Sequence, residues 1–288
     1  MIKKSLLFCG LLATLFTSCE NPAIFGNEET EDPQDNLKVS IHQIEQTPFS
    51  ALTRAEAGIA CTRLNFAVYN EGGTRVKQVN QLSSVANFGT ASFQLPEGDY
   101  HLVVVGHNCD YNPTMTDLTK IQFKNVKEGQ GFSDTFLYYS KVTVTEEPMD
   151  TEVGLKRIVS LCRFVITDDY PEDIARMKFY YTGGSGSFDA TTGFGCVASK
   201  QEVFFDVDSD QKQFDLYTFL HDTEGTVHLM VTALDSGDNV ICERPFDIPM
   251  KQNQITWMSG AFFTGGSGST GVTITINTDW AGESHVSF

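Results

Sequence analysis

The chain has 288 residues and a formal net charge of −17 at pH 7, and it is rich in Phe and Gly but holds only two Trp. A surface this acidic repels nucleic acid and anionic membranes, so neither is an expected partner. The length allows one large or two ordinary domains, and the glycines and short apolar runs predict an all-β protein with tight turns.

The chain begins with the pattern of a lipoprotein signal peptide, which we predict to span residues 1–18. Lys3 and Lys4 precede an apolar segment, residues 5–16, that is too short to span a bilayer, and small residues then lead directly to Cys19. Signal peptidase would cut before Cys19, and several acyl chains on that one residue would give a firm membrane anchor. An ordinary secretory signal followed by a chance cysteine is the alternative.

Residues 19–36 are predicted to form an acidic tether, because they hold several Asp and Glu, two Pro and little that a core could bury. An acidic run after a lipidated cysteine loosely resembles the export signal that sends lipoproteins of Bacteroidetes to the outer face of the outer membrane. A plain solvated linker is the alternative.

The first predicted domain spans residues 37–147. Residues 37–44 alternate apolar and polar side chains, as a half-buried strand does. Arg54 then lies in small, polar chain between two strands, the kind of place that a trypsin-like protease cuts. A polar loop is expected at residues 108–119. Further strands are predicted at residues 60–69, 75–80, 91–95, 99–107 and 134–146, with a weaker one near 120–124.

A repeated Glu-Gly unit suggests that the chain is duplicated. Residues 97–105 and 224–232 each begin with Glu-Gly and continue into an apolar run, as a strand inside a β-sandwich would. Upstream of each copy lies a cysteine followed by an extended apolar run, at Cys61 and Cys162. The duplication predicts two β-sandwich domains in tandem, the second spanning residues 152–288. Chance is the alternative, because Glu-Gly before valines is a common way to begin a strand.

The second domain is predicted to contain one short helix. Asp168 and Asp169 can cap such a helix, and Pro171 suits its first turn. Residues 183–187, Gly-Gly-Ser-Gly-Ser, are expected to form a flexible loop, and the same letters recur at residues 265–269.

A terminal strand is predicted after the second Gly-Gly-Ser-Gly-Ser stretch. Val272, Ile274 and Ile276 alternate cleanly with polar residues. This strand could close its own sandwich or pair with another molecule.

No motif in the sequence points to catalysis, a cofactor or a metal, so we expect a protein that is not an enzyme. Residues 206–217 begin like a calcium loop but lack its Gly and its Glu. His107 and Cys109 have no second pair of zinc ligands nearby. A nucleophile elbow, a metalloprotease motif and a phosphate-binding loop are all missing from the sequence.

Five cysteines follow Cys19, and their spacing shows no disulfide framework. We expect mostly buried thiols, with one disulfide left open, among Cys61, Cys109, Cys162, Cys196 and Cys242.

Several stretches resemble the FimB-type fimbrial subunit family of Bacteroidetes lipoproteins. They are CTRLNF (61–66), VKQVNQ (76–81), NFGTA (87–91), LPEGDY (95–100), GHN (106–108) and DTF (134–136). The resemblance implies two transthyretin-like Greek-key β-sandwiches, export as an outer-membrane lipoprotein, and a place in a surface fimbrium, or type V pilus. It also implies that the partners are other fimbrial subunits, joined by donor-strand complementation, in which a strand of one subunit fills a groove in the next.

This resemblance assigns roles to two segments and to Arg54. Residues 37–44 would be the strand that an arginine-specific protease removes, and residues 272–276 would be the donor strand. A cut after Arg54 would release the first strand together with the lipid, whereas a FimB-like anchor keeps both, so an uncut Arg54 is the alternative. The position at base, shaft or tip stays open, as does a host or bacterial surface ligand.

A different function also fits the lipoprotein pattern, namely a surface glycan-binding protein of a polysaccharide uptake system. Such proteins stack sugars on exposed aromatic rings, usually Trp or Tyr. Only Trp257 and Trp280 are present, and both adjoin strand patterns, which favours the fimbrial interpretation.

Overall fold

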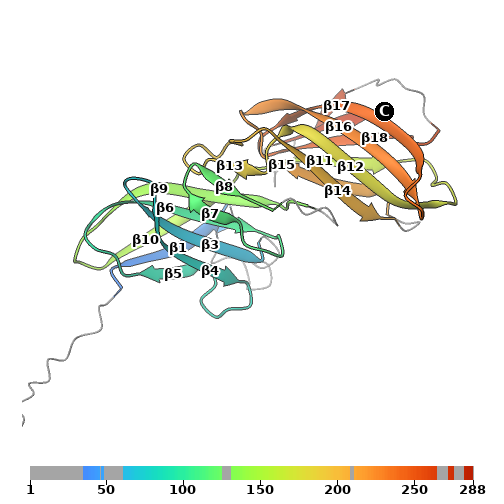
Figure 1. Ribbon diagram of the computed structural model, residues 1–288. Coiled ribbons are helices and arrows are strands. Elements are labelled where there is room, and N and C mark those ends of the chain that lie inside the picture. The colour runs from blue at the N-terminus through green and yellow to red at the C-terminus, as the bar shows by residue number, and fades with distance from the viewer. Residues whose placement is uncertain are drawn as a thin grey trace, which may run out of the picture. The chain divides into compact units, whose positions relative to one another are not determined.

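The computed structural model describes residues 35–45, 47–48, 61–124, 131–207, 211–264, 272–275 and 282–287. The described chain consists of strands and loops, which confirms the all-β class, and it contains no helix that could cross a membrane (Figure 1). Several predicted features lie outside the described residues: the signal peptide, lipidated Cys19, most of the tether, Arg54, residues 265–269, Ile276 and Trp280.

The strands of the first half are β1 (Leu37–Ile44), β2 (Thr47–Pro48), β3 (Arg63–Asn70), β4 (Arg75–Leu82), β5 (Thr90–Phe93), β6 (Gly98–His107), β7 (Thr114–Asp117), β8 (Lys120–Gln122), β9 (Thr135–Val144) and β10 (Met149–Arg157). Those of the second half are β11 (Ser160–Ile166), β12 (Ile174–Gly184), β13 (Ser187–Phe188), β14 (Ser199–Asp206), β15 (Gln213–Thr218), β16 (Glu224–Asp235), β17 (Val240–Lys251), β18 (Gln254–Gly260), β19 (Val272–Thr275) and β20 (Gly282–Ser287). The strands predicted for the first domain are all present, with ends that differ by a few residues.

One pairing pattern occurs twice along the chain. In the first half, the strand orders are β5–β1–β10 and β4–β3–β6–β9. In the second half, the orders β15–β11–β18 and β14–β12–β16–β17 repeat both arrangements. The first strand of each set lies parallel to the last one. We call the two sets the first and the second sandwich, because the two strand orders of each enclose one apolar core. In the first sandwich the two orders are joined where the end of β10 pairs with β9.

The repeated Glu-Gly unit occupies equivalent places in the two sandwiches, in β6 and β16. The cysteines do not correspond. Cys61 precedes β3, whereas Cys162 lies in β11, whose counterpart is β1. A buried thiol packs like any small apolar side chain and can occur in any strand of a core. A cysteine is therefore weak evidence that two strands are equivalent. The predicted domain limits stay a prediction, although strand pairing places β10 with the first sandwich.

A third apolar cluster joins the two sandwiches, and residues 35–288 form one compact unit. It packs the outer face of β3 and β6 against the segment that contains β7 and β8, and against residues of the second sandwich. β8 also pairs with β13 across this contact. The predicted polar loop at residues 108–119 contributes Met115 and Leu118, both buried. The cluster includes Ala67, Val103, Met115, Leu118, Phe123, Phe132, Leu161, Phe188 and Phe219.

The predicted helix near Asp168 is wrong, because this segment is a turn between β11 and β12. Asp168 does cap backbone N–H groups, as the sequence suggested, but they belong to residues 262–264 rather than to a helix of its own. A capping side chain shows that free N–H groups are near in space, not that they follow it in sequence.

The predicted flexible loop at residues 183–187 is also wrong, because most of it is buried. A Cβ on Gly184 would lie 2.0 Å from Thr218 Oγ1, and one on Gly186 would lie 2.8 Å from Phe132. Gly183 has a φ of +90° and approaches the carbonyl of Thr226. These glycines allow close packing of the backbone rather than flexibility.

Candidate strand-exchange site

Strand β1 is inserted between two other strands of the first sandwich. It pairs in parallel with β10 and antiparallel with β5. Its alternating pattern turns Leu37, Val39 and Ile41 into the core, where Leu37 and Val39 are fully buried. Loss of β1 would therefore open the apolar core and leave two strand edges unpaired, which is unfavourable for an isolated molecule.

Asn36 holds the beginning of β1. Its Nδ2 donates to the carbonyls of Leu95 at 2.9 Å and Thr145 at 3.0 Å. Its Oδ1 accepts the N–H of Leu95 at 3.0 Å. One side chain thus ties β1 to the turn before β6 and to the turn between β9 and β10.

Glu45 holds the end of β1. Its backbone has a φ of 54°, a left-handed conformation that ends the strand. Its N–H donates to the carbonyl of Leu155 at 2.7 Å, and its carboxylate accepts the N–H of Arg157. The Arg157 guanidinium in turn makes a bidentate pair with Asp134 at 2.7 and 2.8 Å. Both ends of β1 are therefore fixed by side chains outside its ladder.

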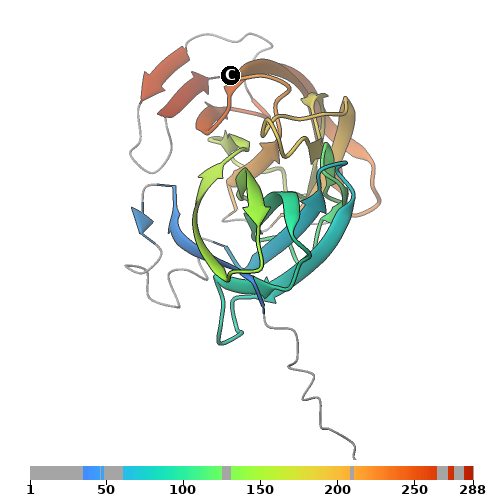
Figure 2. The ribbon, with the colours of Figure 1, turned by 90° about the vertical axis from the view of Figure 1, so that its left-hand side faces the viewer.

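The C-terminal strands form a hairpin on the edge of the second sandwich, coloured red in Figure 2. β20 pairs in parallel with β18, from Gln254 with Gly282 to Ser259 with Ser287. β19 pairs antiparallel with β20. In this structure the predicted terminal strand thus pairs within its own chain, and its role as a donor stays a prediction.

Asp168 fixes the point at which the chain leaves β18 toward this hairpin. Its carboxylate accepts three backbone N–H groups, from Phe262 at 2.9 Å and from Phe263 and Thr264 at 2.8 Å each. Partial desolvation raises the pKa of Asp168, but these hydrogen bonds outweigh it and hold the pKa below its ordinary value. Phe262 is fully buried beside them.

A buried polar cluster in the first sandwich is the most unusual chemical feature of the described residues. His107 is fully buried; one ring nitrogen bonds to Asn65 Oδ1 at 2.8 Å, and the other accepts the N–H of Cys109 at 3.1 Å. Desolvation and the nearby charge of Arg63 lower the pKa of His107 to about 3. The ring is therefore neutral at pH 7 and already bonded at both nitrogens, which makes it a structural group rather than a base or a metal ligand.

The buried thiols are unsuited to nucleophilic chemistry. Cys61, Cys109 and Cys162 are buried, Cys242 is half-buried and Cys196 is exposed; all five are free. Burial, with a smaller effect of the Asp134 charge, raises the pKa of Cys61 to about 12, so its thiol stays protonated. No three or more His, Cys, Asp or Glu of the described part come close enough together to hold a metal.

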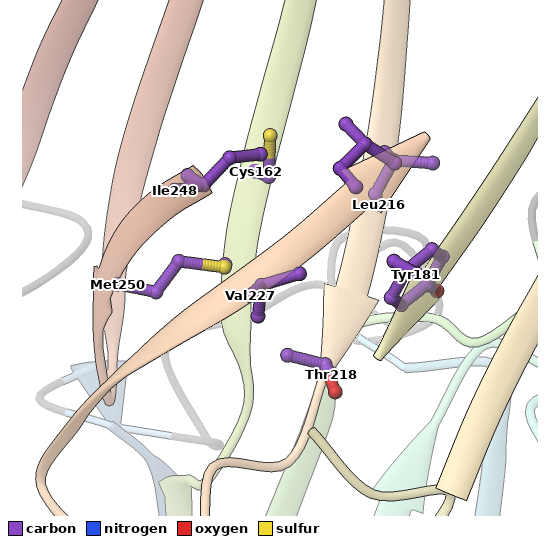
Figure 3. A pocket seen from close by; sticks show the side chains of 8 residues that line it. Cys162, Tyr181, Leu216, Thr218, Val227, Ile248 and Met250 are labelled. Carbon is purple, nitrogen blue, oxygen red and sulfur yellow. The ribbon is translucent and has the colours of Figure 1, made fainter. Parts of the chain in front are cut away.

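The second sandwich encloses a small cavity between its two sheets (Figure 3). Every lining side chain is at most 3% exposed, so the space is closed to solvent. Thr218 Oγ1 finds no hydrogen-bond partner among the described residues. The cavity is a packing gap rather than a ligand site. Its lining consists of Cys162, Tyr181, Leu216, Thr218, Val227, Leu229, Ile248 and Met250.

None of the large hydrophobic side chains that are exposed in the described part is aromatic. Trp257 is half-buried, and the Arg163 guanidinium lies 4.9 Å from the centre of its ring while also pairing with Asp215 at 2.7 Å. The large hydrophobic side chains exposed in the described part are all aliphatic: Val76, Leu82, Val197 and Val240.

Sequence analysis predicted the strands at residues 37–44 and 272–276, but it missed β10, β20 and the residues that fix β1. The two-residue period marked β1, and the structure places it in a core as that period requires. Asn36 and Glu45 had no local signal, because their partners lie about 60 to 110 positions away. Asp168 did give a local signal, since a capping residue followed by proline is typical of a helix N-terminus.

A family model, described as a family of unknown function (DUF6562), matches residues 29–287. No curated protein matches the sequence.

The fold resembles solved structures of Bacteroidetes adhesins and fimbrial proteins, which confirms the resemblance drawn from the sequence. A proposed adhesin from Bacteroides ovatus matches with a TM-score of 0.51 and 16% identity, over 81% of this chain and 88% of the other. A second one from Bacteroides ovatus gives a TM-score of 0.47 and 9% identity, over 72% and 75%. The fimbrial anchor protein Mfa2 from Porphyromonas gingivalis gives 0.42 and 13%, over 72% and 80%. At such identities the likeness concerns the fold alone.

Proposed function

Because the chain belongs to the DUF6562 family and has the fold of a proposed adhesin from Bacteroides ovatus, we propose that it is a structural subunit of a surface fimbrium. In this proposal the protein is not an enzyme, its two sandwiches are of the transthyretin kind, and lipidated Cys19 holds it at the outer membrane. It joins other fimbrial subunits by strand exchange.

The insertion of β1 between β10 and β5 is the observation that carries the proposal. A sandwich whose first strand is inserted in this way can lose that strand and accept another one, which restores both the ladder and the core. Leu37, Val39 and Ile41 fill alternate positions of the core. Val272 and Ile274 have the same two-residue spacing in the sequence, and so does Ile276.

The fixed ends of β1 favour a base or accessory subunit that keeps its first strand. Asn36 and Glu45 add hydrogen bonds at both ends of the ladder, and an exchanging partner would have to displace all of them. A subunit that retains β1 also retains the covalent path from Cys19 to the sandwich. We infer that it works as a lipid-anchored subunit rather than as a polymerising one.

The N-terminus of the protein from its own cell surface tests this role, by mass spectrometry. We expect an acylated Cys19. A start at Ala55 would mean that the chain is cut after Arg54 and loses β1, and it would contradict the anchor role. Deletion of residues 271–288 tests strand exchange itself: we expect loss of co-purification with other fimbrial subunits, and unchanged co-purification would contradict it.

A further inference from the structure

The two sandwiches differ at one equivalent edge. β10 of the first sandwich corresponds to β18 of the second, because each is the last strand of its set and lies parallel to the first. The free side of β18 carries β20, over six residue pairs. β10 has no such neighbour among the described residues: β9 pairs only with Lys156 and Arg157, which leaves the stretch from Met149 to Leu155 open on that side.

On the open side of β10, the structure shows no strand partner for the backbone groups among the residues that it describes. The N–H of Met149 donates to the carbonyl of Asn36 just before β1, and the carbonyl of Leu155 accepts from the chain just after β1. In a parallel ladder, alternate residues bond to opposite sides. The N–H and carbonyl groups of Asp150, Glu152 and Gly154 therefore face away from β1, where an added strand could bond to them.

Apolar side chains of β9 and of the open stretch of β10 are half-buried. Tyr138 and Val142 of β9 and Met149 of β10 are only partly buried against the core of the first sandwich. In the second sandwich, Met258 of β18 is 2% exposed. An added strand beside β10 would gain a ladder, and it would gain apolar contact with Met149 of β10 itself.

The second sandwich closes its edges in two ways that the first does not use. β20 covers β18, and β17, the counterpart of β9, carries Pro245 and Pro249. Proline lacks an N–H and so prevents a further strand from pairing. β9 and β10 contain no proline, and exposed charged side chains, such as Asp150, Glu152 and Lys156 of β10, restrain unspecific pairing there.

We propose that the open side of β10 accepts β20 of a second copy of this chain, after that strand has left its own β18, and that it lies parallel to β10 as β20 lies beside β18 within one chain. This acceptor differs from the place of β1, so it can be used while β1 stays inserted. The inference rests on the proposed function, and it explains how a subunit that keeps its first strand can still receive a partner.

A synthetic peptide of residues 271–288 tests the proposal by titration into the lipid-free mature chain, residues 20–288. The chain's own β20 already fills β18, so binding of one peptide per chain is expected to report the β10 edge. Glu152→Pro removes one outward N–H and should weaken binding at least tenfold, whereas Glu152→Ala should bind as the wild type does. Absence of binding, or equal binding to both variants, would overturn the proposal.

A second pair of variants tests the same acceptor site if Glu152→Pro does not fold. Val142→Glu places a charge among the half-buried side chains of β9 and β10 and should weaken binding. Val76→Glu, at an exposed position on β4, is its control. Glu152→Pro and Val142→Glu could both leave peptide binding unchanged while deletion of residues 271–288 still abolishes co-purification. This result would contradict an acceptor site at β10 but would leave the proposed function supported.

Discussion

The sequence suggested that Asp168 caps a helix that follows it. In the structure its carboxylate instead accepts backbone N–H groups of residues 262–264, which lie far away in the sequence. The change Asp168→Asn should cost about 2 kcal/mol of unfolding free energy, because three N–H groups would lose an ionised acceptor. Urea unfolding at pH 7 measures this loss. Asp169→Asn, at the neighbouring position, is the control and should be near neutral. Equal stability of the two variants would show that the cap contributes nothing.

The carboxylate of Asp168 also makes the free energy of unfolding depend on pH. Because the pKa of Asp168 is lower in the folded chain than in the unfolded one, its contribution is present above the ordinary Asp pKa and is lost as the pH falls through the folded value. The stability difference between wild type and Asp168→Asn should therefore shrink below about pH 4.

His107 should destabilise the fold in mild acid. Its folded pKa of about 3 lies below the ordinary value of 6.5, so the unfolded chain binds the extra proton between these values. The unfolding free energy should fall by about 2 kcal/mol from pH 6.5 to about pH 5 through this group. His107→Gln should flatten the profile in urea unfolding, and His228→Gln, at an exposed position of β16, serves as the control. An unchanged slope in His107→Gln would contradict this assignment.

Gly184 shows why glycine in a sequence does not by itself mean flexibility. A methyl group there would lie 2.0 Å from Thr218 Oγ1, so Gly184→Ala should cost about 3 kcal/mol in chemical unfolding. Adding Thr218→Ala should recover much of the loss, since it removes the colliding hydroxyl. Gly72→Ala, whose nearest contact would be 3.5 Å away, is the control. Lack of recovery in the double variant would place the strain elsewhere.

At the scale of the strand, the attachment of β1 can be tested through its first contact. Asn36→Ala removes three hydrogen bonds and should destabilise the fold by about 1–3 kcal/mol. Faster hydrogen exchange of the backbone amides of residues 37–44 is the measurement, because β1 would open more often. Asp35→Ala, one residue earlier and exposed, should leave exchange unchanged.

Strands were predictable from the sequence, while their partners were not. The alternation in residues 37–44 and the turn glycines located most strands, because period and turn chemistry are local properties. The sheet order depends on contacts far apart in sequence, as in the pairing of β1 with β10, and no local pattern encodes it. Residues 160–166 illustrate the limit in a single case: Cys162 suggested a counterpart of β3, yet β11 corresponds to β1.

At the scale of the whole molecule, the third apolar cluster should make the described chain unfold as one unit. Phe219 is fully buried in it and contacts the rings of Phe123, Phe132 and Phe188. Phe219→Ala should cost about 3–5 kcal/mol. Calorimetry of the wild type should show a single transition, and two well-separated transitions would contradict the coupling. Phe204→Ala, at a partly exposed position, should cost less.

This cluster was the part of the fold least accessible to sequence analysis. Several of its residues, among them Cys109, Met115 and Leu118, come from residues 108–119, which look like a loop because they are mostly polar and show no period. Their few apolar side chains gain meaning only when both sandwiches bring them together.

The two-sided pairing of β1 also has a mechanical consequence. A pull on residue 35 along the axis of β1 would load the bonds to β10 and β5 in shear, so that many must rupture together rather than one after another. Rupture under load is governed by the unfolding rate rather than by the equilibrium free energy. A protein tethered at its N-terminus would thus meet traction with a strand whose backbone bonds are loaded together.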